Sequence, residues 1–155
     1  MEFGLHSVRD VCTAAERRLE AQFAGKEIEL TLDAPDDLPR VRMDDERILQ
    51  VLINLLGNAL QYTEPGGQVR LQAEAADGSV VITVADTGVG LDPSDLTRIF
   101  ERFYRVDKSR SRPHGGSRIG LAVSRHIVRA HGGRIWAESS GPGLGSRFGF
   151  GQPLS

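Results

Sequence analysis

Two asparagines four residues apart, Asn54 and Asn58, are the first candidates for chemistry in this chain. Residues at this spacing share one face of a helix, and Gln61 extends the same face. At about 100° per residue, this amide face lies roughly 120° from the apolar stripe of the same segment. Amide oxygens are hard, neutral ligands that suit Mg²⁺ without repelling a polyphosphate. A pair of solvated surface asparagines is the alternative at this point.

A carboxylate follows the most apolar strand candidate of the chain. Asp86 opens the run Asp-Thr-Gly-Val-Gly, directly after the segment 79–85. A carboxylate at a strand end can accept a hydrogen bond from an exocyclic amine. Gly88 and Gly90 let the backbone approach a flat ligand or adopt a positive φ. A simple turn between a strand and a helix explains the same residues equally well.

A glycine-opened helix and a basic loop form the third candidate. Gly115 and Gly116 precede a predicted helix, and Gly120 lies in its first turn. Backbone N–H groups at the start of a helix bind phosphate. Residues 102–118 add six cations that suit a triphosphate: Arg102, Arg105, Lys108, Arg110, Arg112 and Arg118. A flexible connector with a solvated basic surface is the alternative reading.

Composition narrows the class of protein. The 155 residues correspond to one domain, and 19 Lys plus Arg against 21 Asp plus Glu give a net charge of −2. This balance argues against a bulk nucleic-acid binder. The single cysteine, Cys12, excludes an internal disulfide framework, and we expect no redox role for it. No apolar run approaches the roughly 20 residues of a membrane span, and the first residues lack a secretion signal. We therefore expect a soluble globular domain in a reducing compartment.

The elements that must position these residues follow from periodicity and turn residues. Helices are predicted over 5–24, from a cap at Asp44 or Asp45 to Tyr62, over 93–100 and over 117–131. Strands are predicted over 27–33, 41–43, 68–74, 79–85, 134–138 and 146–150, with a hairpin turn near Asp77 and Gly78. Trp136 is expected in the core, and the four histidines are expected at helix surfaces, loops or helix ends. The order predicts one α+β domain over 1–155, a two-layer sandwich with a mixed sheet of about five strands covered by three helices.

The order of the motifs resembles one known family. The segments 54–59, 86–91, 100–105, 115–123 with 131–133, and 143–148 look like the N box, first glycine box, F box, second glycine box and last glycine box of bacterial two-component sensor histidine kinases. The resemblance is to their catalytic and ATP-binding domain, which has the Bergerat fold. It covers nearly the whole chain from Asp44 to Phe150.

The resemblance implies a role for each site residue. Asp86, supported by Gly88, Gly90 and Ser146, would bind the adenine amino group, and Asn58 would be the Mg²⁺ ligand. Asn54 would line the phosphate side, Tyr62 would pack near the nucleotide, and Arg105 would reach the phosphates. The second glycine box adds further nucleotide contacts, at Gly115, Gly116, Arg118, Gly120 and Leu121. Residues 101–117 would form a mobile ATP lid that excludes water, with Phe100 and Phe103 as its anchors.

The implied reaction is transfer of the γ-phosphoryl group of ATP to a histidine, with Asn54, Asn58 and Arg105 at the chemistry. No histidine of this chain lies in the His-Glu/Asp-x-Arg-x-Pro setting of a phosphoacceptor. We therefore expect an excised catalytic domain, without its dimerisation and sensor domains. Its partners would be the dimerisation domain of the same kinase and a response regulator receiver domain. The isolated domain would be a cytoplasmic monomer without direct membrane contact.

Two positions depart from the family pattern. Arg118-Ile119 stands where Gly-Leu is usual, and Gln61 stands where a lysine is common. Arg118 could add a phosphate contact in place of the missing lysine, or it could crowd the backbone cradle. A degenerate nucleotide-binding docking module is therefore one alternative. Another Bergerat-fold ATPase or serine kinase is a second, but those enzymes use a glutamate where this chain has Asn54, and asparagine cannot act as a base.

Overall fold

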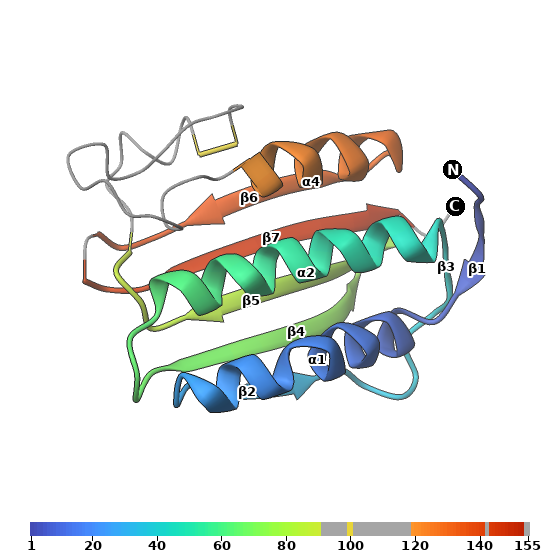
Figure 1. Ribbon diagram of the computed structural model, residues 1–155. Coiled ribbons are helices and arrows are strands. Elements are labelled where there is room, and N and C mark those ends of the chain that lie inside the picture. Colours follow the sequence, from blue (N-terminus) through green and yellow to red (C-terminus); the bar gives the residue numbers. More distant parts are fainter. Residues whose placement is uncertain (91–98, 101–118, 142, 154–155) are drawn as a thin grey trace.

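Three helices lie side by side on one face of a five-stranded sheet (Figure 1). The computed structural model describes residues 1–90, 99–100, 119–141 and 143–153. Its helices are α1 (Val8–Gly25), α2 (Asp45–Tyr62) and α4 (Ile119–Ala130). Its strands are β1 (Gly4–His6), β2 (Glu29–Asp33), β3 (Val41–Met43), β4 (Gln68–Ala76), β5 (Ser79–Asp86), β6 (Arg134–Glu138) and β7 (Ser146–Pro153). The predicted two-layer α+β sandwich is confirmed.

The large sheet is mixed, as expected. Its strand order is β2-β4-β5-β7-β6. The β2–β4 pair is parallel, and the other three pairs are antiparallel. The predicted hairpin joins β4 to β5 through Asp77 and Gly78, both at positive φ (33° and 80°). Two successive positive φ values are what a tight two-residue hairpin turn requires.

The first predicted helix was placed too early. Leu5 and His6 belong to β1, which pairs with β3 in a separate two-stranded sheet, and α1 begins only at Val8. The Ser7 side chain accepts a hydrogen bond from the backbone N–H of Asp10 at 3.2 Å. This serine cap satisfies an otherwise unpaired donor of the first turn, and so it sets the start of the helix. The strand predicted over 41–43 is present, as the partner of β1.

Helix α2 is held at both ends by specific polar contacts. At its start the Asp44 side chain accepts from the N–H of Arg47, at 3.2 Å. At its end the Lys26 ammonium donates to the carbonyl oxygens of Leu60, at 2.7 Å, and Gln61, at 3.3 Å. A cation on the last carbonyls complements the helix dipole. These contacts fix the axial position of the helix that carries Asn54 and Asn58.

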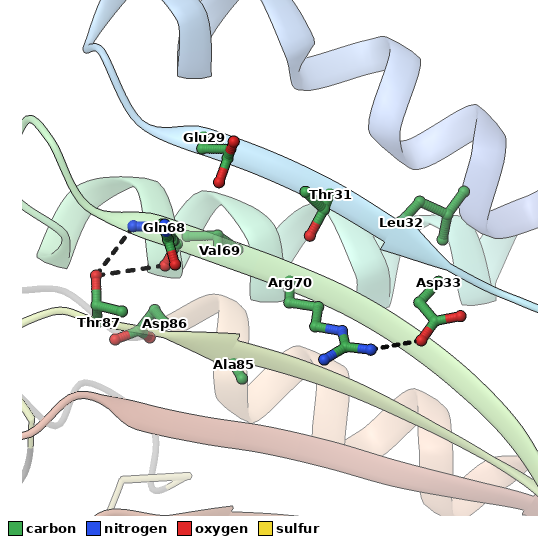
Figure 2. A pocket seen from close by; sticks show the side chains of 10 residues that line it. All are labelled: Glu29, Thr31, Leu32, Asp33, Gln68, Val69, Arg70, Ala85, Asp86 and Thr87. Atoms are coloured by element: carbon green, nitrogen blue, oxygen red, sulfur yellow. Dashed lines mark hydrogen bonds and ion pairs between the residues drawn. The ribbon is translucent and has the colours of Figure 1, made fainter.

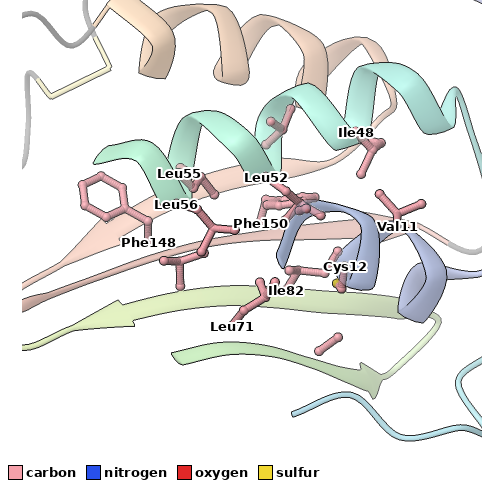
Figure 3. Close-up of a cluster of buried hydrophobic side chains, with 14 of the residues drawn as sticks. Val11, Cys12, Ile48, Leu52, Leu55, Leu56, Leu71, Ile82, Phe148 and Phe150 are labelled. Carbon is pink, nitrogen blue, oxygen red and sulfur yellow. The ribbon is translucent and has the colours of Figure 1, made fainter. Parts of the chain in front are cut away.

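The core lies between the helices and the sheet (Figure 3). The predicted apolar stripe of α2 is buried in full: Ile48, Leu52, Leu55, Leu56 and Ala59 are each at most 1% exposed. Cys12 of α1 is fully buried in the same cluster, and burial, helped by the charge of Glu16, raises the pKa of its thiol to about 12. A thiol with this pKa stays protonated near neutral pH, and the protonated thiol is not the nucleophilic form.

Trp136 was predicted to lie in the core, and this prediction is wrong. Its neighbours Ile135 and Ala137 pack against the core, so the tryptophan lies on the opposite face of β6, half-buried. There it covers Gly149 of β7, where an added Cβ would meet the indole ring at 2.7 Å. The glycine provides the room in which the large ring lies against the face of the sheet that carries no helix.

His131, directly after α4, lies buried next to the N-terminal strand. Its Nδ1 donates to the carbonyl of Ile127 at 2.8 Å, and its Nε2 accepts from the N–H of Asp44 at 3.1 Å. The Phe3 ring packs against the imidazole with centroids 4.7 Å apart. Asp44 in turn accepts from the N–H of Glu2 at 3.0 Å. The predicted helix-end position of His131 is confirmed, and the imidazole also joins the end of α4 to the start of α2.

The carboxyl group of Asp44 makes the free energy of unfolding depend on pH in the acid range. Burial raises the pKa of its carboxyl, but hydrogen bonds from the N–H groups of Glu2, Arg47 and Glu46 outweigh burial, and the net pKa lies below the ordinary value. The ionised form therefore stabilises the fold above the unfolded pKa of about 4, and this contribution is lost as the pH falls through the lower folded pKa. We expect Asp44→Ala to lower the free energy of unfolding by about 1 kcal/mol at pH 7.

The matching measurement is urea unfolding followed by circular dichroism at pH 7 and pH 3. Asp44→Asn keeps a capping oxygen and loses the charge, so its stability should change less between the two pH values than that of the wild type. An identical decrease in both proteins would show that Asp44 does not carry the acid response.

Several predicted elements lie partly or wholly outside the described residues. They are the lid over 101–117 with its anchor Phe103, and most of the short helix over 93–100. Phe100, which was predicted to be the other anchor, packs against the core in an edge-on contact with Phe148, with centroids 6.2 Å apart. No helix in the described part of the chain is long and apolar enough to cross a bilayer.

Candidate functional site

Asp86 ends β5 directly opposite Ser146 of β7. Its Oδ1 accepts from the N–H of Gly88 at 2.8 Å and from the N–H of Ser146 at 3.2 Å, and its Oδ2 accepts from the Ser146 hydroxyl at 2.9 Å. The residue is 9% exposed. These three donors fix the direction of the carboxylate. The predicted grouping of Asp86, Gly88 and Ser146 is therefore present, sixty residues apart in sequence.

The glycines beside Asp86 allow backbone to touch backbone. A Cβ on Gly88 would lie 2.2 Å from the Tyr62 carbonyl oxygen, and one on Gly90, at φ +72°, would lie 2.2 Å from the Gly141 oxygen. The N–H of Val89 donates to the Tyr62 carbonyl at 3.0 Å. The loop 86–90 is thus held between the end of α2 and the segment of Gly141 and residues 143–145. Close approach was expected for these glycines, but toward a flat ligand; here it is toward other parts of the same chain.

The loop before β7 is joined to the loop 86–90 by backbone hydrogen bonds from its own glycines. Gly145 donates its N–H to the Gly88 carbonyl at 3.1 Å, and Gly143 donates to the Val89 carbonyl at 2.6 Å. The Ser139 hydroxyl donates to the Gly145 carbonyl at 2.7 Å and accepts from the N–H of Gly141 at 3.2 Å. Sequence reasoning missed Ser139. A serine just before a glycine-rich segment is a known signal for such local side-chain to backbone bonds.

Gly145 and Gly143 form a matched pair for testing this loop. Both have a positive φ, +76° and +81°, but a Cβ on Gly145 would lie 2.2 Å from the Asp86 carbonyl oxygen, whereas one on Gly143 meets nothing within 4 Å. We expect Gly143→Ala to cost about 1 kcal/mol of stability through backbone strain. Gly145→Ala adds a backbone clash and should cost about 3 kcal/mol. Thermal unfolding measures both, and equal losses would contradict the close contact at Gly145.

Helix α2 presents its amide face away from the core, as predicted. Asn54, Asn58 and Gln61 are all half-buried. The Asn54 side-chain nitrogen donates to the Gly120 carbonyl and to the Ser124 hydroxyl, both at 3.1 Å. Ser124 was not predicted, and nothing in its sequence neighbourhood marks it. Helices α2 and α4 therefore meet through the first asparagine of this face.

The remaining candidates divide into three groups. Tyr62 ends α2, half-buried, where its carbonyl binds the loop 86–90. Gly120 lies against Asn54, and the Leu121 side chain is 2% exposed within the core, so only its backbone could face a ligand. Arg105, Gly115, Gly116 and Arg118 lie outside the described residues.

A hollow of about 510 Å³ lies on the sheet face without helices (Figure 2). Glu29, Thr31 and Asp33 of β2 line it together with Gln68 and Arg70 of β4, and Arg70 is paired with Asp33. Two carboxylates around one paired cation do not suit a polyphosphate. Asp86 contributes to its edge, but the amide face of α2 lies on the other side of the sheet. The chemistry of the predicted site therefore does not lie in this hollow.

Comparison with known proteins gives one consistent result. The family model described as histidine kinase-, DNA gyrase B-, and HSP90-like ATPase matches residues 43–155. The adaptive-response sensory kinase SasA of Synechococcus sp. (strain JA-2-3B'a(2-13)) is 43% identical over 145 residues, which are 93% of this chain and 38% of that protein. The chain thus spans well under half the length of this relative.

Solved structures agree with the family model. The nucleotide-free catalytic domain of histidine kinase ThkA superposes with a TM-score of 0.86 at 27% identity, covering 99% of both chains. ThkA has also been crystallised in complex with the response regulator protein TrrA. Full-length ShkA in complex with AMPPNP gives a TM-score of 0.87 at 31% identity, covering 100% of this chain and 32% of that one.

Proposed function

The chain belongs to the histidine kinase-, DNA gyrase B- and HSP90-like ATPase family, as the ATP-binding catalytic domain of a two-component sensor histidine kinase, and we propose that it positions Mg·ATP for transfer of the γ-phosphoryl group to a histidine on a separate dimerisation domain. The observation that carries the proposal is the Asp86 carboxylate, aimed by Gly88 and Ser146. It lies beside the end of the helix whose amide face bears Asn54 and Asn58.

In this proposal, the Asp86 carboxylate accepts a hydrogen bond from the exocyclic amine of adenine. The exocyclic amine of adenine is a donor, and an oriented, largely buried carboxylate is its natural partner. The neighbouring glycines keep the two loops in contact, so the carboxylate does not need to reorganise when the base binds. Full-length ShkA, which the present chain matches over 100% of its own residues and 32% of the ShkA chain, was crystallised with AMPPNP. We carry nucleotide binding to the present chain on these grounds, and the oriented carboxylate of Asp86 supports its place.

Asn58 is the proposed magnesium ligand. Among the described residues, no group of three or more His, Cys, Asp or Glu side chains is placed to hold a metal ion. A neutral amide oxygen that shares the ion with phosphate oxygens fits this donor set, because Mg²⁺ in nucleotide sites takes few protein ligands. When bound, the ion would neutralise charge on the transferred phosphoryl group. The contribution of the chain is to hold the nucleotide and to direct its phosphates toward an acceptor. Asn54 cannot serve as a general base, which disfavours hydrolysis as the main activity.

The proposed partners follow from the same reasoning. The acceptor histidine belongs to a dimerisation domain, and the phosphoryl group then passes to a response regulator, the class of protein with which ThkA was crystallised. We place the domain in the cytoplasm, as a monomer when isolated.

Two experiments test the proposal in order. Calorimetric titration with AMPPNP, in Mg²⁺ and in EDTA, should give saturable one-to-one binding that is tighter with the ion. Labelled ATP should then transfer its γ-phosphoryl group to a separately produced dimerisation domain, in a form stable to alkali and labile to acid. Rapid phosphate release without an acceptor would favour an ATPase. No binding at all would favour a docking module with a disabled nucleotide site.

A further inference from the structure

The side-chain amide nitrogen of Asn54 donates both of its hydrogens to residues of helix α4. One bond goes to the Gly120 carbonyl and the other to the Ser124 hydroxyl, each at 3.1 Å. Ser124 is fully buried, at 0% exposed. The contact with Gly120 is close, because a Cβ there would lie 3.2 Å from Asn54 Cγ. Figure 1 shows α2 and α4 as neighbours on the same face of the sheet.

The chemistry of the partners fixes which way the amide points. A carbonyl oxygen only accepts, so placing Asn54 Oδ1 against the Gly120 oxygen would bring two acceptors together. The amide nitrogen must therefore face α4. The Ser124 hydroxyl takes the second hydrogen, and this bond adds a constraint on rotation of the amide. With both hydrogens used, the oxygen is the atom that Asn54 offers to a ligand.

We propose that Ser124 is a positioning residue, which acts through Asn54 by holding its amide so that an oxygen and not an N–H group is presented to the magnesium–phosphate end of the nucleotide. The inference rests on the proposed function. It changes the role expected of Asn54, because a side chain whose N–H groups are occupied cannot donate to a phosphate. Its oxygen instead suits the cation or a water molecule bound to the cation.

The test is the gain in AMPPNP affinity that Mg²⁺ provides, measured by calorimetry in Mg²⁺ and in EDTA. In Ser124→Ala one amide hydrogen loses its partner, and only the bond to the Gly120 carbonyl still opposes rotation of the amide. We expect the magnesium-dependent gain to fall roughly tenfold, about 1.4 kcal/mol, while the affinity in EDTA changes less than about twofold, about 0.4 kcal/mol. Ser124→Thr keeps the hydroxyl and should restore most of the gain. Ser79→Ala removes a hydroxyl that bonds to Ala76 at the far end of β5, and serves as the matched control.

A purely structural role for Ser124 predicts a different pattern. Weaker packing of α4 would lower both affinities alike, and a Ser124→Ala effect that persists in an Asn54→Ala background would show that the serine does not act through the asparagine. Either outcome overturns the inference. In the nucleotide-free protein, the side-chain amide protons of Asn54 should exchange with solvent faster in Ser124→Ala than in the wild type, and equal rates would also contradict it.

The design separates this inference from the proposed function. A wild-type domain without any magnesium-dependent gain refutes the proposed function, and the inference with it. A wild-type domain that shows the gain, together with a Ser124→Ala variant that keeps it, refutes the role of Ser124 alone.

Discussion

The Asp86→Asn variant should bind AMPPNP up to about 100-fold more weakly than the wild type and yet unfold at nearly the same temperature. Asparagine has the shape of aspartate, and its oxygen can still accept from the N–H groups of Gly88 and Ser146, as Asp86 Oδ1 does at 2.8 and 3.2 Å. Its nitrogen takes the place of Oδ2, where the Ser146 hydroxyl can turn from donor to acceptor. The loop contacts therefore survive the substitution.

Recognition of the base does not survive it. An amide nitrogen offers hydrogens to an adenine amine that also offers hydrogens, and the ionic component of the bond is lost as well. Hydrogen bonds to charged groups contribute about 1.5–3 kcal/mol, and about 2.8 kcal/mol corresponds to 100-fold in affinity. Asp37→Asn, at an exposed position of a turn, removes the same charge elsewhere and should bind normally. Retained affinity in Asp86→Asn would mean that the carboxylate does not hold the base.

The second large effect is expected at Asn58. Asn58→Ala should lower the rate of phosphoryl transfer by about 10²–10³, the usual loss when one electrostatic contact to a transition state is removed. Binding of AMPPNP in EDTA should stay within about twofold of the wild type, since the adenine contacts at Asp86 are intact. The substitution removes a half-buried amide from α2 but leaves its buried stripe unchanged.

Gln22→Ala removes an exposed amide from α1 and provides the matched control. It should leave both quantities unchanged. If Asn58→Ala instead weakens binding in EDTA as strongly as in Mg²⁺, the residue contacts the nucleotide itself, and the assignment of the magnesium ligand has to move to another residue.

Local patterns predicted the helices and the hairpin well, because their signals lie within one element. The stripe from Ile48 to Ala59 is continuous over three turns, and Asp77-Gly78 is a strong turn signal on its own. The pairing of strands across the sheet has no such local signal. The contact of Asp86 with Ser146 depends on the register of β5 and β7, which no local period encodes. It was predicted only because the motifs resemble those of a known family.

The incorrect predictions have equally specific causes. Strand β1 has three residues, and its partner lies 37 positions further along the chain, so its pattern could not be distinguished from the start of a helix. Trp136 stands between two apolar residues of β6, and the large apolar area of its own side chain favoured the core face, which is the wrong one. The alternation Phe148-Gly149-Phe150 holds the missing signal, since a glycine between two core aromatics leaves room on the opposite face. Ser124 depends on the packing of α2 against α4, which follows only from the assembled fold.

The position of Trp136 determines what the intrinsic fluorescence of this domain reports. It is the single tryptophan of the chain, and its ring lies over Gly149 between β6 and β7, on the sheet face away from the amide face of α2. Its emission should shift to longer wavelength when these two strands separate and the indole meets water. The fluorescence of Trp136 therefore reports the separation of β6 from β7, on the opposite side of the sheet from the helix that carries Asn54 and Asn58.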